Sequence, residues 1–278
     1  MLYIVCLGLG DERGVTVRGL DAVRRCARVY MEFYTSLVAL GADDPPSRLA
    51  SLEKLYGKEI TVADREMMAG DGADQVLRQA ADADVAFLVV GHPFGKTTHT
   101  DLVIRAKNMG IEVKVIDSAS VVNAVGVCGL ELHRYGEAIT MPFFSECCKP
   151  DNFYQAIVNN RWLGLHTLCL LELFITTILY TLIFTSRGKE VCEPPRFMTV
   201  NTALSQLLEV LENRGEPAYD ADSLCIGVAR LGSDDQKIVA GPLEKLVNVD
   251  FGSPPHCLII VGEMNPVEEE MLQFYMIK

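Results

Sequence analysis

The chain has 278 residues, of which 49% are hydrophobic and 22% are charged, and its formal net charge is −12 at pH 7. This length and apolar content are sufficient for two domains of ordinary size or one large one, each with a sizeable core. The acidic balance argues against nonspecific nucleic-acid binding, which needs clustered Lys and Arg. It is compatible with a basic protein partner, or simply with solubility.

The first half of the chain alternates strand and helix patterns, which is typical of a parallel α/β sheet. Short apolar runs predict strands at residues 2–7, 28–34, 59–62, 85–90 and 112–116. Helical spacing of apolar residues predicts helices at residues 17–27, 48–56, 72–80, 100–108 and 121–130. Thr16 and Ser120 are placed to cap the first and the last of these helices.

Beyond Gly136 the pattern changes. Strands are predicted at residues 138–141, 167–173, 224–229, 237–240 and 257–261, together with a long helix at residues 200–212. Fewer helices separate these strands, which indicates more antiparallel pairing. We therefore expect two α/β domains, residues 1–137 with a mainly parallel sheet and residues 138–278 with a mixed sheet.

The apolar run at residues 168–184 raises the question of a membrane span. It is shorter than the roughly 20 apolar residues that a span needs, and it contains Glu172. We expect a buried or interface element instead, and no membrane association. The N-terminus reads as a core strand without a basic region, so no signal peptide is expected.

The nine cysteines are scattered through apolar runs without CxxC spacing. This pattern argues against a disulfide framework or a zinc site, and it favours a reducing, cytoplasmic setting. Cys147 and Cys148 are adjacent in an expected loop, where a redox role is an alternative to a structural one.

Glycine loops follow two of the predicted strands. The first strand ends in Leu7-Gly8-Leu9-Gly10, and the strand at 85–90 continues into Gly91-His92-Pro93-Phe94-Gly95. Ligands of open α/β sheets bind at the carboxyl ends of strands, and glycine lets the backbone approach a ligand closely. These loops predict a cofactor site, with simple turns and helix caps as the alternative.

Other chemical motifs are missing from the sequence. Arg13 stands where a dinucleotide fingerprint needs its third glycine, and no Walker A spacing occurs. The five histidines show no metal-pair spacing, so no metal site is expected. No serine or cysteine lies in a nucleophile elbow.

Several collinear segments together resemble the diphthine synthase family, whose eukaryotic members are diphthine methyl ester synthases. They cover most of the chain: MLYIVCLGLGDERGVTVRGLDAVRRCARVY, VADRE, VAFLVVGHPFGKTTHTDLVIRA, VNAVGVCGLELHRYGE, HTLCLLEL, EPPRFMTVNTALSQLLE and ARLGSDDQKIVAGPLEKL. The resemblance implies two α/β domains of the tetrapyrrole-methylase (class III methyltransferase) type, with a cofactor cleft between them. S-adenosyl-L-methionine is the implied cofactor, and a cytoplasmic homodimer is the implied assembly.

The implied reaction is methylation of a 3-amino-3-carboxypropyl group on one histidine of elongation factor 2. Members of the family methylate the amine three times, and the eukaryotic form also methylates the carboxylate. The family's cofactor contacts fall at eight positions of this chain: Leu9, His92, Gly95, Ser120, Val121, Leu171, Leu231 and His256. No catalytic base is assigned, although His99 and His166 are considered for that role.

The chain departs from the family pattern at two places. The family loop reads Gly-Asp-Pro, and this chain has His92 in place of the aspartate, so it lacks a negative charge that would attract a cationic cofactor. Residues 174–186 are apolar where the family carries a polar stretch. Two alternatives therefore stay open: a relative that binds elongation factor 2 without turnover, and a methyltransferase of the same fold with a small, tetrapyrrole-like substrate.

Overall fold

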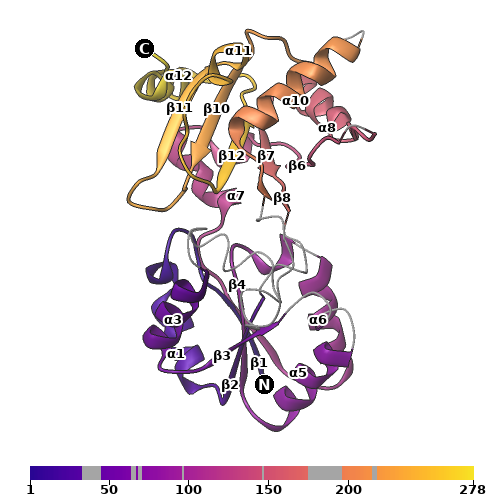
Figure 1. Cartoon of the computed structure of the whole chain (residues 1–278), viewed down its shortest axis with the longest axis vertical. Coiled ribbons are helices and arrows are strands. Elements are labelled where there is room, and N and C mark those ends of the chain that lie inside the picture. The colour runs from indigo at the N-terminus through magenta and orange to yellow at the C-terminus, as the bar shows by residue number, and fades with distance from the viewer. Residues whose placement is uncertain are drawn as a thin grey trace, which may run out of the picture. The chain divides into compact units, whose positions relative to one another are not determined.

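The structure is a computed structural model that describes residues 1–32, 45–63, 67, 71–95, 97–145, 147–174, 196–214 and 218–278. The apolar segment at 175–186, most of the second departure noted above, lies outside the described residues, as do residues 64–66 of the VADRE segment. The described chain forms two compact units, residues 1–121 and residues 122–174 with 196–278 (Figure 1).

The first unit is built on a five-stranded sheet with strand order β3-β2-β4-β1-β5. Its strands are β1 (Leu2–Cys6), β2 (Arg28–Glu32), β3 (Ile60–Ala63), β4 (Val85–Val89) and β5 (Val113–Ile116). Every pairing in it is parallel, which confirms the prediction for this half of the chain. All five residues of β4 are buried, as expected of a central strand covered on both faces.

Helices cover the two faces of this sheet, α1 and α3 on one side and α5 and α6 on the other (Figure 1). Their bounds are α1 (Val17–Arg25), α3 (Pro45–Tyr56), α5 (Asp71–Asp82) and α6 (Thr97–Asn108), with short 3₁₀ turns η1 (Glu12–Gly14) and η2 (Pro93–Gly95). The predicted cap of α1 is present, because the Thr16 hydroxyl accepts the Gly19 N–H at 3.1 Å.

The second unit contains a mixed sheet with strand order β11-β10-β12-β7-β6. Its strands are β6 (Ile139–Met141), β7 (Thr167–Leu171), β10 (Leu224–Ala229), β11 (Lys237–Pro242) and β12 (His256–Ile260), and a small pair is formed by β8 (Leu173–Phe174) and β9 (Arg196–Phe197). Only β6 and β7 of the five-stranded sheet pair in parallel, so the expected antiparallel character is confirmed.

Helices and turns complete the second unit: α7 (Val121–Ala124), η3 (Val125–Cys128), η4 (Leu132–Arg134), α8 (Tyr154–Trp162), α10 (Val200–Asn213), α11 (Leu243–Leu246), α12 (Pro266–Leu272) and η5 (Gln273–Tyr275). The core of the unit is packed tightly beneath α10. A Cβ at Gly227 of β10 would lie 2.3 Å from Phe251 Cζ, so glycine there makes room for the fully buried ring.

Three features differ from the sequence predictions. The helix expected over residues 121–130 is one turn of α7 followed by the 3₁₀ turn η3, which suits a run rich in β-branched valines and interrupted by Gly126. Helices α8 and α12 were not predicted. The compact units divide after Val121, earlier than the expected boundary at 137/138, because η3 and η4 contact the C-terminal segment through the Glu131 N–H to Glu268 and the Tyr275 hydroxyl to the Val127 carbonyl.

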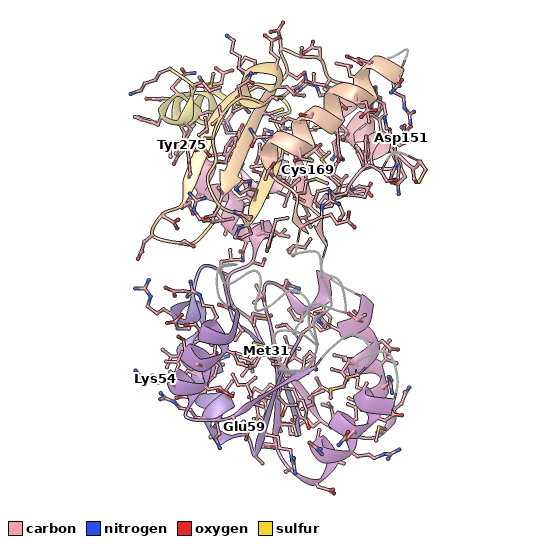
Figure 2. The ribbon with its side chains drawn as sticks, viewed as in Figure 1. Met31, Lys54, Glu59, Asp151, Cys169 and Tyr275 are labelled. Carbon is pink, nitrogen blue, oxygen red and sulfur yellow. The ribbon has the colours of Figure 1, made fainter. Side chains whose placement is uncertain are left out.

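Side-chain burial follows this architecture (Figure 2). Met31 lies inside the first unit and Cys169 inside the second, whereas Lys54 and Glu59 lie at the surface. Six of the described cysteines are buried and free, and Cys147 and Cys148 are exposed. Within the described residues, no helix has the length and apolar character needed to cross a membrane.

Candidate functional site

The first sheet reverses its direction of winding between the adjacent strands β1 and β4. From β1 the chain passes through α1 to β2 on one side, and from β4 it passes through α6 to β5 on the other. The two strand ends stay paired, because the Leu7 N–H donates to the Val89 carbonyl at 2.8 Å. Ligands of open α/β sheets bind beyond the carboxyl ends of strands at such a point.

The loop after β1 folds back on itself. Gly8 has φ +81°, and a Cβ there would lie 2.3 Å from the Gly14 carbonyl oxygen. This oxygen also accepts the Ser118 hydroxyl at 2.8 Å, which joins the loop after β1 to the loop after β5. Glycine at position 8 is therefore required by contacts within the loop, whereas the sequence analysis had assigned it to close approach of a ligand. Leu9 is partly buried beside it.

The loop after β4 presents open backbone. Gly91 is partly buried with φ +73°, and apart from its two chain neighbours no atom of the described residues lies within 4 Å of the position a Cβ would take. His92 is exposed, and its Nδ1 accepts the Phe94 N–H at 3.2 Å. An aspartate accepts the N–H two residues on in the same way, so His92 keeps the turn while lacking the negative charge. Backbone with free space beside it at a strand end fits a polar ligand.

A buried histidine makes a hydrogen bond to the backbone of this loop. His99, on α6, is 3% exposed, and its Nδ1 lies 2.6 Å from the Pro93 carbonyl oxygen. A carbonyl oxygen only accepts, so Nδ1 carries the hydrogen. Nε2 lies 3.3 Å from Oε2 of Glu32, the last residue of β2. Nε2 itself has no well-directed hydrogen bond within the described part of the chain.

Five predicted cofactor residues lie on the loops after β1, β4 and β5, which are neighbours in the sheet. Ser120 is buried, and Val121 begins α7, as the predicted capping position requires. These five candidates thus lie beyond the carboxyl ends of neighbouring strands of the first sheet: Leu9, His92, Gly95, Ser120 and Val121.

The other three candidates belong to the second unit, where they lie at one end of its sheet. Leu171 ends β7, His256 begins the antiparallel strand β12, and Leu231 lies in the turn that follows β10. Leu171 and Leu231 are partly buried. Because Ala229 pairs with His256 in the sheet, the turn that holds Leu231 starts next to that histidine.

The ring of His256 is fully engaged by the backbone. Its Nδ1 accepts the Val200 N–H at 3.2 Å, and Nε2 donates to the Ser253 carbonyl at 3.1 Å. Burial lowers the pKa of His256 from its ordinary value, consistent with a neutral ring. A cofactor contact by His256 would therefore use its backbone or the face of the ring.

His166 is also fully engaged, which argues against a role as catalytic base. The fully buried ring accepts the Gly262 N–H at Nδ1, 2.9 Å away, and its Nε2 lies 3.3 Å from Glu268 Oε1. Burial lowers the pKa of His166. Across the described residues, no group of three or more His, Cys, Asp or Glu side chains is arranged to hold a metal ion.

Sequence reasoning did not include Glu32 among the site residues. The available signal was a carboxylate directly after the apolar run Val29-Tyr30-Met31, since a carboxylate rarely lies beside a core without a partner. The sequence favours a structural role for His99 over that of a base, but its contact with the Pro93 carbonyl is not foreseeable from spacing.

Comparison with known proteins gives a consistent result. The family profile described as Tetrapyrrole (Corrin/Porphyrin) Methylases matches residues 1–247. The Arabidopsis thaliana relative named "Probable diphthine methyl ester synthase" is 55% identical, with 100% of this chain and 99% of the relative covered. The Homo sapiens diphthine methyl ester synthase is 48% identical, with coverages of 100% and 95%.

A solved structure shares the fold. The crystal structure of a diphthine synthase homologue from Entamoeba histolytica matches with a TM-score of 0.84 and 41% identity, covering 100% of this chain and 99% of that one. The likeness extends over both units of the chain.

Proposed function

The chain belongs to the tetrapyrrole methylase family and is a methyltransferase, and we propose that it makes diphthine methyl ester on elongation factor 2 with S-adenosyl-L-methionine as methyl donor. The observation that carries this proposal is the full-length similarity to diphthine methyl ester synthases, at 55% and 48% identity. The substrate is the 3-amino-3-carboxypropyl group on a histidine of that factor.

The candidate residues fit the proposed cofactor. Open backbone at Gly91 and the loops after β1 and β5 provide polar groups at a strand edge, and Leu171 and Leu231 provide apolar surface. We assign contacts with the cofactor to all eight residues: Leu9, His92, Gly95, Ser120, Val121, Leu171, Leu231 and His256. When bound, S-adenosylmethionine supplies a methyl group on a positively charged sulfur that is already activated for transfer.

The protein's contribution is alignment and exclusion of water rather than acid–base chemistry. Methyl transfer needs the nucleophile, the methyl carbon and the sulfur in line, so positioning lowers the barrier. A substrate carboxylate is anionic at neutral pH and needs no base, whereas the amine must first lose its proton. His99 and His166 are buried and bound to neighbouring groups, so neither is assigned as base.

The remaining parts of the proposal concern the setting. A homodimer in the cytoplasm, acting on a protein substrate without nucleic acid or membrane, is what the family resemblance implies. The full-length relatives support the protein substrate through their names alone.

The test is calorimetric titration of the purified chain with S-adenosylmethionine and S-adenosylhomocysteine. We expect saturable binding of both, followed by methylation of elongation factor 2 that carries the unmethylated precursor. Mass spectrometry counts the methyl groups added, and mild alkaline hydrolysis removes only an ester methyl, which separates diphthine from its methyl ester.

Two other outcomes define the competing functions. A folded chain that binds elongation factor 2 but neither ligand would be a non-catalytic relative. His92 would then be the first residue to test as the cause of the lost cofactor binding. A chain that binds S-adenosylmethionine but methylates only a small tetrapyrrole-like acceptor would be a small-molecule enzyme of the same fold.

A further inference from the structure

One peptide unit of the loop after β4 is held at both ends by imidazole rings. The N–H of Phe94 donates to Nδ1 of His92 at 3.2 Å, and the carbonyl of Pro93 accepts from Nδ1 of His99 at 2.6 Å. These two groups belong to the same peptide bond, in which N–H and C=O point in opposite directions. The two rings therefore bind it from opposite sides.

The two histidines must act with opposite hydrogen-bond polarity. Nδ1 of His92 accepts and so carries a lone pair, whereas Nδ1 of His99 donates and so carries a hydrogen. A rotation of the Pro93–Phe94 peptide would place the Phe94 N–H against the Nδ1–H of His99. It would also place the Pro93 carbonyl against the lone pair on Nδ1 of His92. Both hydrogen bonds would be lost together, so this peptide has one preferred orientation.

The ring of His99 is itself held in place. It is 3% exposed, and it meets the edge of the buried Phe87 ring at a centroid distance of 6.2 Å. Glu32, the last residue of β2, lies 3.3 Å from its Nε2. His92, by contrast, lies at the surface, and among the described residues its ring contacts Phe94 of the same loop.

We propose that His92 and His99 form a peptide clamp that fixes the orientation of the Pro93–Phe94 peptide and thereby sets the affinity of the loop for the cofactor. The clamp rests on the proposed function in that it names positioning residues for the same site. A loop whose polar backbone groups are already oriented binds its ligand without an ordering cost. The clamp is the device that orients them, and Gly91 leaves the adjacent backbone open.

Pairs of matched substitutions separate the clamp from mere packing. Asparagine places its amide near the position of Nδ1, and glutamine reaches nearer to that of Nε2. We expect His99→Asn to keep the donor to Pro93 and His99→Gln to lose it. At position 92, the side-chain oxygen of Asn can still accept the Phe94 N–H. The longer side chain of Gln places its oxygen too far from the position of Nδ1 to accept it in the same turn.

The first readout is the Kd for S-adenosylhomocysteine. We expect each Gln variant to bind about tenfold more weakly than the Asn variant at the same position, near the upper end of what one lost hydrogen bond causes. In turnover assays KM for S-adenosylmethionine should rise while kcat at saturation changes little. Because both rings hold one peptide, the double Gln variant should lose less than the product of the single losses.

The second readout needs no cofactor. Hydrogen exchange at the Phe94 amide, followed by NMR, should be slow in wild type and in both Asn variants. It should be faster in His92→Gln and also in His99→Gln, although residue 99 does not contact that N–H. Only a shared peptide orientation predicts the effect of residue 99 on this amide.

Three results would overturn the clamp. These are equal Kd values for Asn and Gln variants at both positions, additive losses in the double variant, or unchanged Phe94 exchange in His99→Gln. Weaker binding with a matching fall in Tm for both His99 variants would show packing alone. If wild type bound neither ligand, the proposed function would fail, and the orientation of the peptide would still be decided by the exchange rates.

Discussion

Each unit contains one buried histidine beside a glutamate, and the two pairs have the same separation. Nε2 of His99 lies 3.3 Å from Glu32 in the first unit, and Nε2 of His166 lies 3.3 Å from Glu268 in the second. Their surroundings differ. Glu268 accepts the N–H groups of Glu131 and Asn265, each at 2.8 Å, and His166 accepts the Gly262 N–H.

The same residue types at the same distance therefore do not define a role. In the second unit backbone donors surround the pair, so it ties η4, β7 and α12 together and acts in stability. In the first unit Nδ1 of the ring binds a loop peptide at the carboxyl ends of the strands, and Nε2, 3.3 Å from Glu32, has no hydrogen bond within the described residues. The hydrogen-bond partners separate the structural pair from the positioning one.

Removing Glu268 is expected to have the largest effect. Glu268→Ala leaves two backbone N–H groups and the buried His166 without their acceptor, which should lower the free energy of unfolding by about 3 kcal/mol or more. Urea unfolding measures this, with the exposed Glu270→Ala on the same helix as control, expected within about 0.5 kcal/mol. A loss at Glu268 no larger than the control would contradict a structural role.

Acid is expected to weaken the second unit in two stages. The pKa values of His166 and His256 are lowered from 6.5, mainly by burial, so the unfolded chain takes up protons first and stability falls as pH drops below about 6.5. Burial acts to raise the pKa of Glu268, but the N–H groups of Glu131 and Asn265 outweigh it and the pKa is lowered from 4.5. Its contribution is therefore present above about pH 4.5 and is lost below it.

Thermal unfolding across this pH range tests the first stage. The His256→Gln variant removes one titrating group. Its free energy of unfolding should therefore fall less steeply than that of wild type as the pH drops from neutral to below about 6.5. A slope equal to that of wild type would show that His256 does not contribute to the acid sensitivity.

Restoring a charge at position 92 is expected to have the smallest effect. His92→Asp keeps an acceptor for the Phe94 N–H and adds a negative charge near a cationic cofactor, so S-adenosylmethionine should bind a few-fold more tightly at low salt. His92→Asn, which keeps the acceptor without the charge, is the matched neutral control. S-adenosylhomocysteine, which lacks the sulfonium charge, should not distinguish Asp from Asn; equal affinity of both variants for S-adenosylmethionine would remove the charge argument.

Much of the fold could be predicted from local pattern. Apolar runs such as residues 85–89 indicated buried parallel strands, and the change of pattern after Gly136 indicated a mixed sheet. The signal for α12 was also present, because Asn265 and Glu268 form a capping box with Pro266 at the first helical position. Helix α8 offered less, since its asparagines are poor helix formers.

Local patterns were enough to predict the strands, the glycine loops, the sheet types and the family, because these depend on short-range periodicity and on collinear motifs. Only the tertiary structure decided that β1 and β4 are neighbours, since strand order depends on long-range packing that no local pattern records. It also decided the roles of the histidines. The sequence does not distinguish the roles of His99, His166 and His256. Each role depends on which backbone groups the fold brings to the two ring nitrogens.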